Sequence, residues 1–170
     1  MASAEGARLA QTIRQKLEEM NRVCAGLDEA KASRAPAGRW SPKEIISHLS
    51  GPEGIGLLPA FQAILTQDTP RIDIEAADSN YTGKRPKMTF AELLSQLNGE
   101  YGSIAELVTG LSDEQLARKA HIPLFKESPL GEYPTLGVFV GALAEYHMDE
   151  HINHMKEILA ALGAASAPQK

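Results

Sequence analysis

The sequence predicts an all-α protein, a four-helix bundle with long connections and one short extra helix. Three observations support this prediction. Apolar residues recur at intervals of three and four over long stretches, which is typical of helices that bury one face. Three helix-starting patterns, a serine or threonine followed three residues later by glutamate or glutamine, also occur. Apolar residues make up 43% of the chain and include few aromatics, so we expect a core of leucine, isoleucine, alanine and valine.

The first two helices are predicted from an apolar stripe and from a start signal. The first covers residues 4–27, where apolar residues follow the helical period. The second begins at Pro42, because Ser41 is a favourable N-cap, proline suits the first helical position and Glu44 completes a capping box. We expect a kink or break near Gly51. The apolar spacing then resumes with Leu58, Phe61 and Leu65.

The second half of the chain contains a long loop and three more helices. Residues 68–88 lack a helical period, and loops of this length in a compact domain are usually functional or mobile. A helix is predicted over residues 89–111, and the short extra helix over residues 112–119. The last helix covers residues 135–162, and a frayed tail is expected over residues 163–170.

Length and charge limit the class of protein. The 170 residues predict a single domain, residues 1–170, of helical-bundle type. The formal net charge is −5 and the pI about 5.5, which argues against a nucleic-acid partner because phosphate backbones attract clustered lysine and arginine. The one basic cluster, which we interpret as part of a solvated loop, consists of Lys84, Arg85 and Lys87.

Cysteine usage and hydropathy favour a cytoplasmic protein. Cys24 is the single cysteine, so no internal disulfide can form, and we interpret it as a small core filler rather than a nucleophile. The first ten residues do not resemble a signal peptide. No stretch approaches the ~20 apolar residues of a membrane helix. We therefore expect no membrane association.

Three histidines fall on the apolar face of the last predicted helix. At about 100° per residue, His147, His151 and His154 project within about 60° of one another. Their imidazoles are therefore expected in the core, where each must find hydrogen-bond partners or donate a lone pair to a metal ion. Residues four apart lie one above the other, so His147 and His151 can bind one ion at ~2.0–2.1 Å each. His151 and His154 form an alternative pair.

A third ligand must come from another element, and His48 is our candidate. It lies beside Leu49 on the second helix, on a face that we expect to be apolar. Three imidazoles leave coordination positions open for water or substrate, as in catalytic sites. We therefore predict that His48, His147 and His151 bind one divalent transition metal, with zinc, nickel and iron all compatible with imidazole. His121 lies in an irregular stretch and is predicted at the surface.

Two segments of the chain resemble a known family. Residues 40–49 read WSPKEIISHL, and residues 146–155 read YHMDEHINHM. Together they are similar to the DinB-like superfamily, also called the YfiT-like metal-dependent hydrolases, and the resemblance spans nearly the whole chain. In that family a histidine on the second helix and a His-x-x-x-His pair on the last helix bind a divalent metal within a four-helix bundle. The resemblance therefore implies His48, His147 and His151 as the ligands.

The resemblance also implies an activity. Members of the family include hydrolases, and also transferases that use low-molecular-weight thiols. The resemblance therefore implies a small-molecule substrate, a low-molecular-weight thiol as a possible partner, and a homodimer. Many members have a further histidine immediately before the final ligand, where this chain has Glu150. Glu150 and His154 are our candidates for a general base, because they are adjacent to the ligands.

Two other functions stay open at the level of the sequence. The first is a non-catalytic, metal-binding helical bundle that acts in stress response or sensing. The second is a metal-free interaction module, in which the histidines form hydrogen bonds to one another and to backbone groups.

Overall fold

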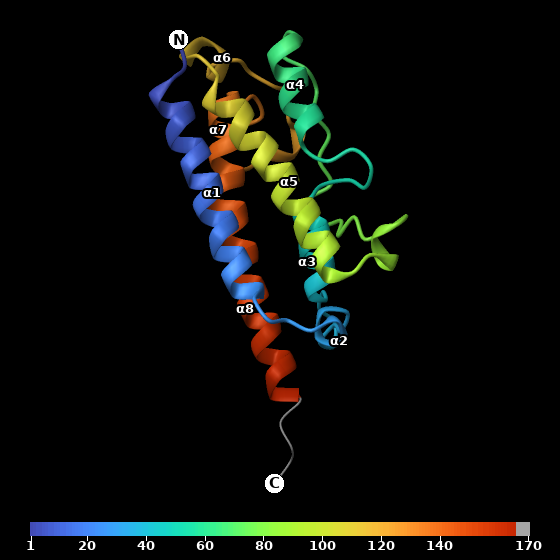
Figure 1. Ribbon diagram of the computed structural model, residues 1–170. Helices are drawn as coiled ribbons and strands as arrows, with labels where there is room; N and C mark the ends of the chain where they lie inside the picture. The colour runs from blue at the N-terminus through green and yellow to red at the C-terminus, as the bar shows by residue number, and fades with distance from the viewer. Residues whose placement is uncertain (166–170) are drawn as a thin grey trace.

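The computed structural model describes residues 1–165, which form a bundle of helices (Figure 1). The α-helices are α1 (Ala4–Cys24), α2 (Glu29–Ala32), α3 (Pro42–Leu49), α4 (Leu58–Thr66), α5 (Phe90–Thr109), α6 (Asp113–Leu116), α7 (Leu136–Gly141) and α8 (Met148–Ala165). A π-helical turn, Ala142–His147, joins α7 to α8, so the three form one continuous rod. Short 3-10 helices cover Arg85–Lys87 and Pro123–Phe125.

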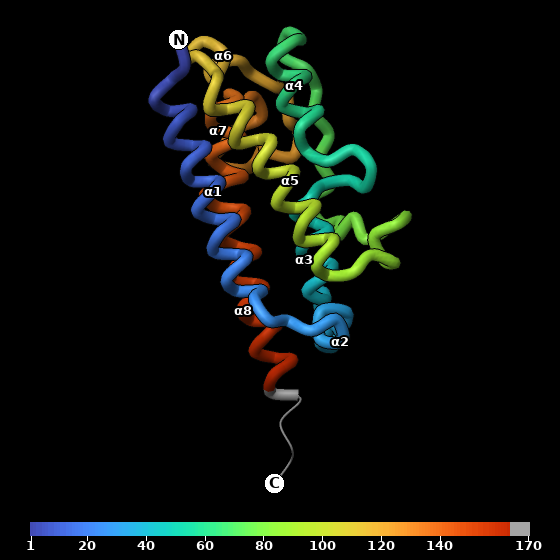
Figure 2. The backbone as a smooth tube through the Cα atoms, in the orientation of Figure 1, coloured from blue at the N-terminus to red at the C-terminus, as the bar shows by residue number. Residues whose placement is uncertain are grey.

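Four helical segments form the bundle. Helix α1 packs against α5 and α8, and α3 packs against the same two helices. The chain trace shows that α1 and the α7–α8 rod run in the same direction, whereas α3 and α5 run in the opposite direction (Figure 2). The predicted all-α four-helix bundle is confirmed.

The local start signals produce the helix starts that the sequence predicts. The hydroxyl of Ser41 accepts a hydrogen bond from the Glu44 amide at 3.2 Å, and the Glu44 carboxylate accepts one from the Ser41 amide at 3.2 Å. Thr89 and Ser112 begin α5 and α6 with the same reciprocal pattern. An N-cap of this kind stabilises a helix by about 1 kcal/mol. The break after α3 falls at Gly51, whose φ of 75° favours glycine.

The structure differs from the predicted elements at several points, and the π turn that divides the predicted last helix is one of them. Helix α1 ends at Cys24, before the predicted end, and the unpredicted helix α2 follows it. Helix α6 ends at Leu116, because a turn and an extended stretch follow. Residues 163–165 of the predicted frayed tail continue α8, and residues 166–170 lie outside the described residues.

Cys24 is buried, and burial raises the pKa of its thiol to about 12, which fits a core filler. Within residues 1–165, none of the helices has the length and apolar character that a membrane crossing requires.

Candidate metal centre

Three imidazoles from two separate helical segments meet in the bundle. His48 comes from the last turn of α3, His147 ends the π turn and His151 lies in the first turns of α8. The ring centroid of His48 lies 5.1 Å from that of His147 and 4.6 Å from that of His151. One ring nitrogen from each histidine can be chosen so that no two are more than 4.8 Å apart. The sequence therefore identified residues that the fold brings together.

The backbone of the 68–88 loop orients the His48 ring. Nδ1 of His48 lies 2.7 Å from the carbonyl oxygen of Asp78. Because a carbonyl oxygen only accepts, Nδ1 carries a proton, and Nε2 is the nitrogen of His48 that is left to bind a metal ion. Metal-binding histidines commonly donate their second ring N–H in this way, which fixes the tautomer and the ring orientation.

The π turn sets the direction in which His147 points. Val140 before the turn, Leu143 and Ala144 within it, and Met148 and Ile152 after it are all buried. A π turn adds about one residue to a regular α-helix, so after it Met148, rather than His147, lies on the most buried side of the helix. His147 is half-buried beside it. Of the three imidazoles predicted in the core, His151 is buried, whereas His147 and His154 are half-buried at the border of the cavities.

Burial keeps the imidazoles of the last helix neutral. Desolvation, with a smaller effect of His48, lowers the pKa of His147 to about 4. Desolvation, followed by the neighbouring His147, His48 and His154, lowers the pKa of His151 to about 3. A neutral imidazole has a free lone pair, which a metal ion requires and a protonated imidazole lacks.

The three nitrogens are close enough to share a divalent ion once their rings turn inward. Two nitrogens of a tetrahedral site that each lie ~2.1 Å from one ion are ~3.4 Å apart. The observed separations reach no more than 4.8 Å, so the nitrogens must approach one another by up to about 1.4 Å, through rotation of the imidazoles and small shifts of their helices. Imidazole nitrogens, one of them on a ring whose second N–H is already bonded to a carbonyl, suit a divalent transition metal.

Aromatic and polar groups surround the cluster. Trp40, the single tryptophan, packs against two of the histidines. Its ring centroid lies 5.0 Å from that of His48 and 6.3 Å from that of His151. Nδ1 of His154 lies 3.4 Å from Nδ1 of His151, so His154 borders the cluster without contributing to the converging nitrogens. Glu150 is exposed beside His147.

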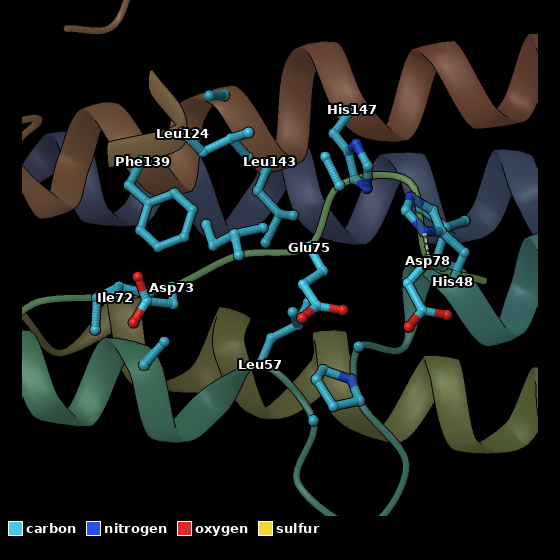
Figure 3. A pocket seen from close by; sticks show the side chains of 18 of the residues that line it. His48, Leu57, Ile72, Asp73, Glu75, Asp78, Leu124, Phe139, Leu143 and His147 are labelled. Atoms are coloured by element: carbon cyan, nitrogen blue, oxygen red, sulfur yellow. Dashed lines mark hydrogen bonds between the residues drawn. The ribbon is translucent and has the colours of Figure 1, made fainter. Parts of the chain in front are cut away.

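The cluster opens into cavities on two sides. A cavity of about 760 Å³ lies between the histidines and the segments around α4 and α7 (Figure 3). A second hollow of about 500 Å³ lies against Trp40 and His154. His48, His147 and Glu150 line both, so a ligand can reach the histidines from either side.

One wall of the larger cavity is fixed by a contact between helices. The amides of Leu57 and Leu58, at the start of α4, donate to Oε1 of Glu100 on α5 at 2.5 Å and 2.9 Å. The carboxylate thus caps a helix that has no cap of its own. Gly56 lies against it with a φ of 73°, and a Cβ there would meet Oε1 of Glu100 at 2.5 Å. Only glycine fits this approach without displacing Glu100.

A buried arginine fastens the loop that orients His48. Arg85 is 2% exposed, and its Nη1 donates to the carbonyl oxygens of Ser47 at 3.0 Å, Gly51 at 2.5 Å and Asn80 at 3.3 Å. It therefore joins the end of α3 to the chain just after Asp78. The prediction that Arg85 belongs to a solvated cluster was wrong, because its neighbours in sequence do not show that backbone carbonyls surround it.

The remaining histidine lies elsewhere. Nε2 of His121 is 2.9 Å from Oε1 of Glu132, and its ring stacks on Tyr133 at 4.8 Å. It is not among the three converging histidines. Sequence reasoning missed Arg85, the Asp78 carbonyl and the cavity residue Glu75, and only the unusual length of the 68–88 loop pointed to this region.

A four-helix bundle with a histidine cluster between its helices defines the class of protein. The sequence model of the DinB superfamily matches residues 12–162. Because this match covers more than half of the chain, the chain belongs to the DinB superfamily.

A solved structure has the same fold. YfiT from Bacillus subtilis, described as a probable metal-dependent hydrolase with an unusual four-helix bundle topology, matches with a TM-score of 0.74. The match covers 96% of this chain and 91% of that chain at 20% identity, so the likeness shows the fold. The search of curated proteins found no match for this chain.

The lowered pKa values predict how stability depends on pH. Between pH 6.5 and about 4, the unfolded chain protonates His147 and His151 whereas the folded chain does not, so the free energy of unfolding falls as the pH falls. We expect the wild type, kept in a chelator, to lose about 2 kcal/mol more than a His147→Asn/His151→Asn variant between pH 7 and 4.5. Urea unfolding followed by circular dichroism measures this difference. Equal losses in the two proteins would show that these imidazoles are not desolvated.

The hydrogen bonds of Arg85 predict a second effect on stability. An Arg85→Met variant leaves buried carbonyl oxygens without a donor, so we expect its free energy of unfolding to fall by about 3 kcal/mol. Lys84→Met, a change at the exposed preceding residue, is the matched control and should cost less than about 0.5 kcal/mol. Urea unfolding at pH 7 provides both values. Similar stabilities of the two variants would contradict a fastening role for Arg85.

Proposed function

We propose that this protein is a metal-dependent enzyme, a hydrolase of small molecules, in which His48, His147 and His151 hold one divalent transition metal ion. The convergence of three imidazole nitrogens is the observation that carries the proposal. A bound divalent ion supplies a Lewis acid that polarises a carbonyl and lowers the pKa of bound water or thiol. Three protein ligands leave room for such a group.

The protein residues have distinct parts in this proposal. His48 binds through Nε2, because the Asp78 carbonyl accepts the proton of Nδ1. His147 and His151 are neutral before binding, so no proton must leave them first at neutral pH. Glu150 is our first candidate for the general base, because its carboxylate borders both cavities at the histidines. His154 is the second candidate, through its contact with His151.

The larger cavity provides the substrate site of the proposed enzyme. Its volume of about 760 Å³ is within the range of small-molecule sites. Its wall is mainly apolar and continues to the histidines, so a substrate held there has one end at the proposed ion (Figure 3). The name given to YfiT, a probable metal-dependent hydrolase, agrees with this chemistry.

Transfer to a low-molecular-weight thiol is the alternative activity. This transfer needs the same metal ion and a second site, which holds the thiol. The hollow beside Trp40 has room for such a site. The two activities differ in their products. A hydrolase releases the acid and alcohol of an ester in water alone, whereas a transferase requires added thiol.

Metal binding is the first test of the proposal. We expect untagged protein to bind one zinc or nickel ion per chain, and alanine at His48, His147 or His151 to weaken binding about 100-fold or more. His121→Ala, outside the cluster, is the control and should bind as the wild type does. Quenching of Trp40 fluorescence by Ni²⁺ reports binding directly, since this side chain packs on two of the rings. Equal binding by the cluster variants and the control would contradict the ligand assignment.

Turnover is the second test. Metal-loaded wild type should hydrolyse members of an apolar ester panel, and His147→Ala should abolish turnover while the far-ultraviolet circular dichroism stays unchanged. Repeating the panel with added cysteine separates hydrolysis from thiol transfer. A protein that binds metal but turns over neither panel would instead be the non-catalytic metal-binding bundle.

A further inference from the structure

An extended strap of chain carries carboxylates along the larger cavity. Residues 71–78 run beside the cavity from the end near Phe139 towards the histidines (Figure 3). The strap is fixed at its start, because the amide of Ile72 donates to the His121 carbonyl at 2.9 Å. Ile72 and Ile74 pack against the core, and the exposed Asp73 and Glu75 alternate with them. The strap therefore places acidic groups at the cavity in a defined order.

The charge of the cavity lining has one sign. Its carboxylates are those of Asp73, Asp78, Glu75 and Glu150, and none of the described residues that line it is a lysine or an arginine. Of the nearby cations, Arg71 pairs with one of these carboxylates, that of Asp73, at 3.0 Å, and the guanidinium of Arg85 is buried among backbone carbonyls. The carboxylates of Asp78, Glu75 and Glu150 have no such cationic partner within residues 1–165. An anionic ligand would therefore meet repulsion along this lining.

Glu75 stands out among these acidic residues. Asp73 is paired with Arg71, and the Asp78 carboxylate accepts a hydrogen bond from the Asn80 amide at 2.8 Å. Within residues 1–165, the carboxylate of Glu75 has no hydrogen-bond or ion-pair partner. Figure 3 shows it directed into the cavity, between Leu57 and His147. It is thus available to a ligand.

The rest of the lining suits an apolar ligand. Leu57, Phe61, Leu143 and Phe139 contribute side chains to the wall. The exposed Ile55 and Tyr146 extend this apolar surface to the mouth of the cavity. Apolar contact area of this kind supplies affinity, and a few polar groups fix the orientation of a ligand.

We propose that the larger cavity selects an apolar substrate that carries a positively charged group, such as a quaternary ammonium, and that Glu75 is the residue that selects the charge. This inference rests on the proposed function, because it concerns the substrate of the same site. Imidazole ligands carry no negative charge, so they do not offset the charge of a divalent ion. The cationic group therefore binds along the strap, and the reacting end of the substrate faces the histidines.

Three probes with one apolar body test the charge preference. They are (4-phenylbutyl)trimethylammonium, 4-phenylbutan-1-ol and 4-phenylbutane-1-sulfonate, and none relies on a titrating group. Dissociation constants come from NMR titrations of the protein, both in chelator and loaded with zinc. In chelator we expect the cation to bind about tenfold more tightly than the sulfonate, with the alcohol between them, and 0.5 M NaCl to reduce this ratio.

Substitutions of Glu75 test whether this residue causes the preference for a cation. Glu75→Gln should weaken binding of the cation about threefold and leave the alcohol unchanged, and Glu75→Lys should remove the preference. Glu106→Lys, the same charge reversal at an exposed position of α5 outside the cavity, is the matched control and should keep it. The NMR spectrum of each variant verifies its fold.

The results in chelator decide the inference independently of the metal. Binding of the sulfonate as tight as that of the cation, no binding of any probe, or equal effects of Glu75→Lys and Glu106→Lys would overturn it. A failure of zinc to bind would overturn the proposed function instead, and it would leave the charge preference measured in chelator unaffected.

Discussion

The convergence of three imidazoles between α3 and the α7–α8 rod is the constraint on which the rest of the site depends. Polar rings in a helical core are costly unless their nitrogens are satisfied. Here one nitrogen of His48 is satisfied by the Asp78 carbonyl, and desolvation holds His147 and His151 in the unprotonated form. Burial of these rings costs free energy in a metal-free core. It also disfavours their protonation, which leaves their lone pairs available to a metal ion.

Two features of the surrounding chain accompany this convergence. The π turn inserts one residue into the last helix, so Met148 takes the core position and His147 reaches the cavity edge. Turns of this type are frequent at functional sites. On the opposite side, Arg85 holds the 68–88 loop against the end of α3, and the loop in turn supplies the carbonyl that orients His48. The fold thus positions the ligands through a helix irregularity and a buried cation.

The sequence predicted what depends on local chemistry. Capping boxes act within four residues, so the starts at Ser41 and Thr89 could be read directly, and His-x-x-x-His spacing fixes neighbours on one helix. The burial of Arg85, the direction of Glu75 and the π turn could not be predicted, since each depends on contacts between distant segments. Contacts between distant segments also determine the path of the 68–88 loop, because its sequence shows neither a helical nor a strand period.

An anomalous-scattering measurement on crystals of zinc-loaded protein tests the central claim most directly. Difference maps from data collected on either side of the zinc absorption edge locate the ion without reference to activity. The account predicts one peak per chain, ~2.0–2.1 Å from a nitrogen of each of His48, His147 and His151. A peak held by other residues, or none at these three rings, would contradict it.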